Sequence, residues 1–277
     1  MAKLTETSSR PSAVVLGDPK SGKTRLIGTL CQIVPTLVVT ADSEGLDTLR
    51  SMEVNPEVVL LKSWDTVWDS YLEIARYASK EGYKALALDD FGAMQKEARH
   101  RIEMQPRERE SSMPAAQRSQ AITQALLRGQ RRMYYQQWGE LAIALDSFLY
   151  EMVKLPFSFV LVTATTELHR HPMTGEEHIY PGLQGSIRYD MLARFGLVGV
   201  TFNEEQAGAV HFCLTCRPHP RIPTGTRYGE GRTWVDPTAE KLLKHLYRRE
   251  LPEDKESALE RTIGSGIRAN NNDRRAS

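Results

Sequence analysis

The sequence contains few cysteines and no long apolar run. Three cysteines, an odd number in 277 residues, cannot all pair in a disulfide framework, so a reducing compartment is favoured. No hydrophobic run approaches the length of a membrane span, and residues 1–12 lack the apolar centre of a secretory signal peptide. We therefore expect a cytoplasmic protein that has no membrane partner.

A charge excess of either sign is also absent. The 36 lysine and arginine residues nearly balance the 35 aspartate and glutamate residues, which leaves a formal net charge of +1. This balance gives no global attraction to nucleic acid, so any nucleic-acid surface must be local. The hydrophobic fraction of 40% is ordinary for a globular chain that buries one large core.

A complete phosphate-binding motif is present near the N-terminus. Residues 17–24 read G-x-x-x-x-G-K-T, after an apolar run at residues 13–16 and before a helical pattern at residues 25–30. A strand that leads through such a loop into a helix presents backbone N–H groups and the positive end of the helix dipole to an anion. We expect Lys23 to contact the β- and γ-phosphates of ATP and Thr24 to hold Mg²⁺. The predicted cofactor-binding residues are Gly17, Asp18, Pro19, Lys20, Ser21, Gly22, Lys23 and Thr24.

Four further apolar runs alternate with helical patterns along the chain. Runs that are apolar throughout predict strands buried on both faces, as in a parallel sheet covered by helices, and the predicted fold class is therefore α/β. The runs lie at residues 37–40, 58–61, 85–88 and 157–162. Later patterns predict a long helix at residues 134–154, a closing pair of strands at residues 197–202 and 209–215 with a turn near residues 203–206, and a helix at residues 238–249.

The domain organisation follows from where these patterns begin and end. We expect one domain at residues 13–250, a flexible arm at residues 1–12 and a disordered polar tail at residues 251–277. Within the domain, residues 97–132 form an Arg-rich segment that we expect Pro106 and Pro114 to break.

Two carboxylates are candidates for the chemistry of an NTPase. Asp89 directly follows the strand predicted at residues 85–88, where a carboxylate can hold Mg²⁺ through water; Asp90 is the next candidate. The alternative for this position is a carboxylate that caps the following helix. Glu44 lies just past the strand at residues 37–40, at the sheet edge where α/β ligands bind, and can activate the attacking water. Its alternative is a solvated carboxylate that opens the next helix.

These motifs together resemble RecA-like P-loop ATPase cores. The phosphate loop, the D-x-E at residues 42–44 and the strand that ends at Asp89 have the order and spacing of that superfamily. Details of residues 19–24, of residues 180–185 and of the late strand ending at Arg217 are similar to a phage-type branch, the single-strand annealing recombinases. The resemblance covers about residues 13–222 and implies a RecA-like fold, ATP and Mg²⁺ as cofactors, and a homo-oligomeric ring or filament. It also implies the cytoplasm of a bacterial host if a phage encodes the protein.

The resemblance implies roles for individual residues. Glu44 matches the water-activating glutamate and, with Lys23 and Arg217, forms the predicted catalytic set. Residues 163–165 match the sensor of the γ-phosphate, where relatives often place His or Gln and this chain has Thr-Ala-Thr. Arg217, and after it Arg221, matches basic residues that reach the nucleotide of the neighbouring subunit. A solvated surface charge is the alternative for each of these arginines.

Two segments are candidates for binding single-stranded DNA. In RecA-like cores the DNA loops follow the fourth and fifth strands, which here are the Arg-rich segment and a long loop that we expect at residues 165–190. Arginine suits backbone phosphates, and an aromatic such as Tyr180 can stack on a base. The alternative for the Arg-rich segment is a helix that solvates its own face. The predicted nucleic-acid-binding residues are Arg128, Arg131 and Arg132, which share one helical face, and Arg170.

The sequence thus predicts a P-loop ATPase that binds single-stranded DNA and promotes annealing in phage-type recombination or replication, with a single-strand binding protein as a possible partner. One alternative is a helicase loader or motor ATPase that remodels a protein. Another is a nucleotide switch or small-molecule kinase that has no DNA role. Cys213 and Cys216, which resemble half of a zinc site, are better interpreted as buried structural thiols because no second C-x-x-C is present.

Overall fold

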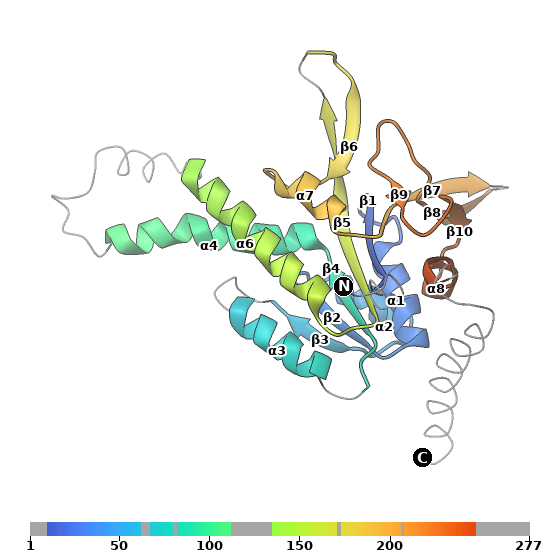
Figure 1. Ribbon diagram of the computed structural model, residues 1–277, viewed down its shortest axis with the longest axis horizontal. Coiled ribbons are helices and arrows are strands. Elements are labelled where there is room, and N and C mark those ends of the chain that lie inside the picture. The colour runs from blue at the N-terminus through green and yellow to red at the C-terminus, as the bar shows by residue number, and fades with distance from the viewer. Residues whose placement is uncertain are drawn as a thin grey trace, which may run out of the picture.

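The computed structural model describes residues 10–61, 67–79, 82–111, 135–170, 173–206 and 208–247. These residues form a ten-stranded sheet with helices on both faces (Figure 1). The strands are β1 (Ser12–Gly17), β2 (Thr36–Thr40), β3 (Glu57–Leu60), β4 (Ala85–Asp89), β5 (Phe159–Arg170), β6 (Glu177–Pro181), β7 (Leu197–Gln206), β8 (Ala209–Thr215), β9 (Gly225–Thr226) and β10 (Thr233–Val235). The helices are α1 (Lys23–Ile33), α2 (Gly45–Ser51), α3 (Val67–Ser79), α4 (Phe91–Ser111), α6 (Tyr135–Lys154), α7 (Ile187–Ala193) and α8 (Ala239–Tyr247).

The centre of the sheet is parallel. The strand order is β10-β8-β7-β1-β5-β4-β2-β3, and every pairing from β7 to β3 is parallel. Among the strands of the described residues, antiparallel pairs occur only toward the β8–β10 edge and where β6 and β9 join β5 and β7. The predicted α/β class, a mostly parallel sheet flanked by helices, is confirmed.

Alternate residues of the central strands enter two separate cores. Val14 and Leu16 of β1 pack with α3, α4, α6 and α7, whereas Ala13 and Val15 pack with α1, α2 and α8. This two-sided burial explains why the central strands are apolar throughout rather than alternating with polar residues. Cys213 and Cys216 are both fully buried, as predicted for structural thiols.

The carboxyl ends of the parallel strands form one edge of the sheet, where the phosphate loop begins. Gly17 at the end of β1 lies level with Thr165 of β5 and Thr201 of β7. Asp89 at the end of β4 is level with Thr40 of β2. Residues from five strands therefore meet at the position where open α/β sheets bind ligands.

The expectation of a loop at residues 165–190 was wrong. Strand β5 continues past Thr165 to Arg170 and pairs with β6 in an antiparallel hairpin, after which α7 follows. The hairpin stands away from the sheet next to α7 (Figure 1). Because most of its residues are polar and either exposed or half-buried, they lack the continuous apolar pattern that identifies a buried strand.

Two smaller expectations also need correction. Helix α4 continues through Pro106 to Ser111, so this proline does not end it. Strand β7 extends through residues 203–206, and the turn to β8 comes later than predicted. Helices α4 and α6 lie side by side and project from the sheet (Figure 1).

Some predicted features lie outside the described residues. These are most of the N-terminal arm, the C-terminal tail, Pro114 and the predicted DNA-binding residues Arg128, Arg131 and Arg132. Within the described part of the chain, no helix is both long enough and apolar enough to cross a membrane.

Candidate nucleotide-binding site

The phosphate loop turns through backbone conformations that favour glycine. Gly22, the residue before α1, has φ 92°, and Lys20 has φ 65°. A Cβ atom at Gly22 would lie 2.8 Å from Cδ1 of Phe212 in β8. The left-handed conformation and the close aromatic ring both require glycine at this position, which fixes how the chain enters α1.

Lys23 occupies the hollow of the loop. Its side chain is largely buried, and Nζ donates hydrogen bonds to the carbonyl oxygens of Gly17 at 2.8 Å and Asp18 at 2.9 Å. Burial lowers the pKa of Lys23, while the carboxylates of Asp90, Asp89 and Asp18 act in the opposite direction. The ammonium group therefore lies where an incoming phosphate oxygen can replace the loop carbonyls as its partner.

Thr24 and Asp89 lie in direct contact. The Thr24 hydroxyl donates to Oδ2 of Asp89 at 3.1 Å, and the Asp89 side chain is almost fully buried. Burial raises the pKa of Asp89, and hydrogen bonds from Thr163 and Thr24 partly offset this effect. Mg²⁺ binds oxygen ligands such as hydroxyls and carboxylates. The Thr24 hydroxyl and the Asp89 carboxylate lie close enough to bind one Mg²⁺ ion together, so these residues fit the ion. Bound there, Mg²⁺ would neutralise charge on the β- and γ-phosphates.

Asp89 and its neighbour Asp90 have different structural roles. Asp90 has φ 52°, and its Oδ1 accepts a hydrogen bond from the N–H of Gly92 at 2.8 Å. The side chain of Asp90 therefore caps the start of α4. The helix-cap alternative weighed for this pair of aspartates applies to Asp90, whereas Asp89 faces Thr24.

Glu44 lies at the start of α2, on the same edge of the sheet. Its side chain is exposed, and its N–H donates to Oδ1 of Asp42 at 2.9 Å. A Cβ atom at Gly45 would lie 3.2 Å from Oδ2 of Asp89, so the beginning of α2 packs against the Asp89 carboxylate. This packing brings Glu44 to the Asp89 side of the phosphate loop, although its role in activating water stays a prediction.

Threonines of β5 connect several parts of the site. The Thr163 hydroxyl donates to Oδ1 of Asp89 at 2.8 Å and accepts from the N–H of Asp90 at 2.9 Å. The Thr166 hydroxyl donates to the Asp18 carboxylate of the phosphate loop. Residues 163–165, the position predicted to sense the γ-phosphate, lie in the middle of β5, which continues from them into the hairpin.

Two residues of the site were missed in the sequence. The Thr201 hydroxyl lies 2.7 Å from that of Ser21 and donates to the carbonyl oxygen of Leu16 at 3.1 Å, which ties the loop to β7. Phe212 packs against Gly22, as described above. Both residues lie far from the motif in sequence, and only the pairing of β7 with β1 and β8 brings them to the loop.

Arg217 lies just after β8 and is exposed to solvent. Because β8 is antiparallel to β7, it runs away from the edge that carries the phosphate loop. The following loop returns to the hairpin, where the carbonyl oxygen of Arg221 accepts from the N–H of Ile179 in β6 at 2.9 Å. Neither arginine is brought to the phosphate loop of its own chain, and a role at a neighbouring subunit stays a prediction.

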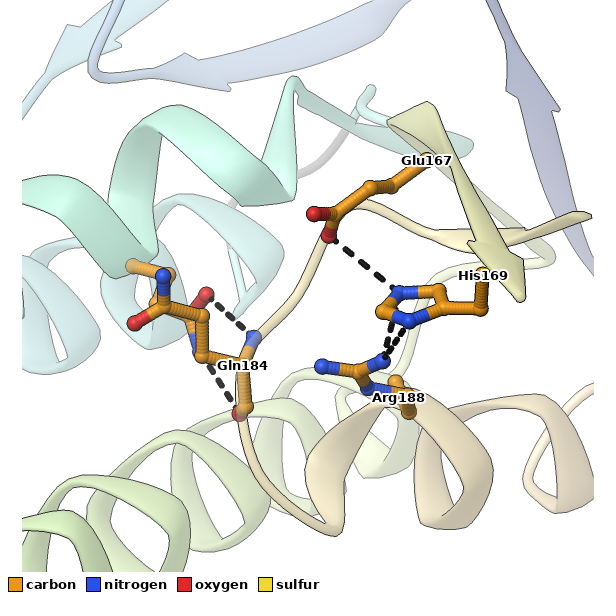
Figure 2. A network of polar contacts seen from close by, with 5 residues as sticks. Glu167, His169, Gln184 and Arg188 are labelled. Atoms are coloured by element: carbon orange, nitrogen blue, oxygen red, sulfur yellow. Dashed lines mark hydrogen bonds and ion pairs between the residues drawn. The ribbon is translucent and has the colours of Figure 1, made fainter. Parts of the chain in front are cut away.

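Aromatic and histidine side chains gather on the hairpin and α7. The ring centroid of Tyr180 lies 5.1 Å from Tyr189, 5.9 Å from His169 and 6.1 Å from His178. Figure 2 shows His169 between Glu167, at 3.3 Å, and Arg188 of α7, whose Nη1 is 3.0 Å from Nδ1 of His169. We call Tyr180, Tyr189, His169, His178 and Arg188 the hairpin cluster.

Two further sets of contacts lie next to the hairpin cluster and at the tip of the hairpin. The side-chain amide of Gln95 in α4 accepts from the N–H of Gln184 at 2.8 Å and donates to its carbonyl oxygen at 3.2 Å (Figure 2). Arg170, predicted to bind nucleic acid, lies at the end of β5, where its Nε donates to the carbonyl oxygen of Gly175 at 3.2 Å. The connection between β6 and α7 is thus tied to α4, whereas Arg170 lies at the far end of β5.

Comparison with known proteins adds little to this geometry. No protein-family model matches the sequence, and no curated protein matches it. Among solved structures, a KaiC-like protein from the hyperthermophilic archaeon Pyrococcus horikoshii OT3 is similar, with 13% sequence identity and a TM-score of 0.43 over 82% of this chain and 85% of that one. A similarity this low says nothing about ligand or activity.

Proposed function

We propose that the protein is a RecA-like, Mg²⁺-dependent ATPase. The observation that carries this proposal is the contact between the Thr24 hydroxyl and the buried Asp89 carboxylate, beside the ammonium group of Lys23. Lys23 and Thr24 begin α1 and Asp89 ends β4, and together they supply a metal site next to a phosphate site. Few other chemistries need a cation-binding pair and a buried lysine at the mouth of a glycine-rich loop.

In the proposed reaction, water attacks the γ-phosphate in line with the leaving ADP. Glu44 accepts a proton from this water, the bond between the γ-phosphorus and the bridging oxygen breaks, and ADP leaves. Mg²⁺ held by Thr24 and Asp89 would neutralise charge on the phosphates. The exposure of Glu44 supports the proposal because an accessible carboxylate can reach a solvent molecule.

We further propose that the hairpin cluster binds single-stranded DNA. Tyr189 is 54% exposed, and it and Tyr180 offer edge-to-face aromatic surfaces on which bases can stack. Residues 166–181 carry three glutamates and one arginine, so this hairpin supplies stacking surface rather than positive charge. Phosphate contacts would therefore come from Arg188 of α7 and from the Arg-rich segment.

Strand β5 supports a link between ATP and DNA. It contacts Asp89 through Thr163 and Asp18 through Thr166, and it continues without interruption into the hairpin cluster. A phosphate that moves the Asp18 side chain away from Thr166 would therefore change a contact at the start of the hairpin. In this proposal, bound ATP favours the conformation in which the hairpin cluster binds DNA, and ATP hydrolysis releases the DNA. Complementary strands anneal when several subunits bind them together.

The ATPase rate with and without an unstructured oligonucleotide tests this function. We expect stimulation by DNA in the wild type, and annealing of complementary strands without unwinding. Tyr189→Ala should weaken DNA binding by roughly 5- to 150-fold, the equivalent of one stacked base, whereas Tyr189→Phe should keep it. Tyr150→Ala serves as the matched control, because Tyr150 is an exposed tyrosine on α6 outside the hairpin cluster. If the two Tyr189 variants bind equally, the hairpin cluster is not the stacking site.

A protein-remodelling ATPase is the second candidate, and one observation favours it. Leu168 and Met173 on the same hairpin are 59% and 89% exposed, which is unusual for apolar side chains and suits a protein contact. ATP turnover that does not respond to DNA, together with no DNA binding in the presence of ATP, would favour this candidate.

A further inference from the structure

The two ends of a bound nucleotide would lie on opposite sides of β1. Thr24 and Asp89 would hold Mg²⁺, and with it the γ-phosphate, on the side of β4, which lies beyond β5 in the sheet. Because the base and the γ-phosphate are at opposite ends of a nucleoside triphosphate, the base extends toward the other neighbour of β1. That neighbour is β7, followed by β8.

An exposed arginine and a half-buried aromatic ring lie on that side. Phe212 of β8 packs against Gly22, the last residue of the loop before α1. The guanidinium carbon of Arg25, in the first turn of α1, lies 5.0 Å from the centroid of the Phe212 ring. Arg25 is exposed, so its side chain borders the loop and faces solvent.

The position of Phe212 is fixed by its surroundings. Phe212 is paired with Asn203 of β7, and its carbonyl oxygen accepts from the N–H of Asp236 at 2.6 Å. Asp236 in turn lies 2.9 Å from Nδ1 of His211. These contacts fix the backbone of Phe212, and its ring already lies against Gly22 and Arg25. A side chain that is in place before the ligand arrives lowers the cost of binding.

We propose that Arg25 and Phe212 form the subsite for the α-phosphate and base of a nucleoside triphosphate; this inference rests on the proposed ATPase function. The Arg25 guanidinium donates to an α-phosphate oxygen, since it projects from the first turn of α1 next to the phosphate loop. The base stacks against the Arg25–Phe212 pair, and the planar guanidinium can stack on a base as it does on the ring. Stacking tolerates any base, so this pair adds affinity for nucleosides over inorganic phosphates and discriminates weakly between ATP and GTP.

The test compares Mg²⁺·ATP with Mg²⁺·tripolyphosphate, which has the phosphate chain but no ribose or base. Wild-type protein should bind ATP more tightly than tripolyphosphate. Phe212→Leu keeps apolar packing on Gly22 and should weaken ATP by roughly 5- to 150-fold while tripolyphosphate affinity stays unchanged. Arg25→Ala should weaken ATP at least as much. Val210→Ala, two residues from Phe212 on the same strand and 66% exposed, is the control that should change neither.

Two results would overturn the subsite and leave the phosphate loop intact. These are wild-type protein that binds both ligands equally, and variants that bind ATP as the wild type does. An equal loss of affinity for ATP and for tripolyphosphate in a folded Phe212→Leu protein would also overturn the subsite. Phe212 would then affect the phosphate loop as a whole rather than the base. If the wild type binds neither ligand, the proposed ATPase function fails and the subsite with it.

Discussion

Thr163→Val tests whether β5 positions the carboxylate of Asp89, the proposed Mg²⁺ ligand. The fully buried Thr163 hydroxyl donates to Asp89 and accepts from the N–H of Asp90, and valine has nearly the same shape without either bond. A hydrogen bond to a charged group contributes about 1.5–3 kcal/mol, and an unsatisfied N–H costs a further 1–3 kcal/mol or so. We expect the free energy of unfolding to fall by about 3 kcal/mol, which for a domain of this size lowers Tm by roughly 6–12 °C.

The assay is thermal unfolding of three proteins, together with their ATP turnover. Thr163→Ser keeps the hydroxyl and loses only a buried methyl group, so its loss should be about 1 kcal/mol. ATP turnover should fall in the valine variant and remain near wild type in the serine variant, because only the former releases Asp89. The reasoning would be refuted by a valine variant that unfolds at the wild-type temperature or matches the serine variant in turnover.

Three further predictions test separate parts of the molecule. Glu44→Gln should bind ATP normally while turnover falls by roughly 100-fold or more; turnover within a few-fold of wild type would place the base elsewhere. Replacing Arg128, Arg131 and Arg132 with alanine should weaken binding of an unstructured oligonucleotide and flatten its dependence on salt, and equal slopes would remove this patch from the DNA site. Burial raises the pKa of Cys31 from 9.0 to about 11, so at pH 8 its alkylation in the native protein should be about 100-fold slower than in denaturant, and equal rates would contradict this.

The central part of the fold was accessible from sequence because each buried strand has a clear pattern. The apolar runs of β1, β2, β4 and the first half of β5 follow from burial on both faces, and these residues are indeed buried. The hairpin was not predicted because its strands are stabilised by pairing with each other rather than by burial. Its polar, histidine-rich sequence is typical of a loop.

The candidate site likewise contains residues that the sequence predicts and residues that it does not. The motif spacing predicts Lys23 and Thr24, and the strand end predicts Asp89; the structure brings these three together. Contacts from Thr201 and Phe212 depend on which strands become neighbours, and no local pattern carries that information. The roles of Glu44 and Arg217 stay predictions, because each depends on a reaction or a subunit that a single chain does not contain.

Calorimetric titration of ATP into wild-type protein and Lys23→Ala, with and without Mg²⁺, tests the central claim most directly. Lys23 donates to two loop carbonyls, so thermal unfolding should first establish that the variant is folded. We predict Mg²⁺-dependent ATP binding by the wild type and a loss of at least about 100-fold in affinity in the variant, because a largely buried cation that pairs with phosphate has been removed. Equal ATP affinity in wild-type protein and in a folded Lys23→Ala variant would contradict the assignment of residues 17–24 as a nucleotide-binding loop.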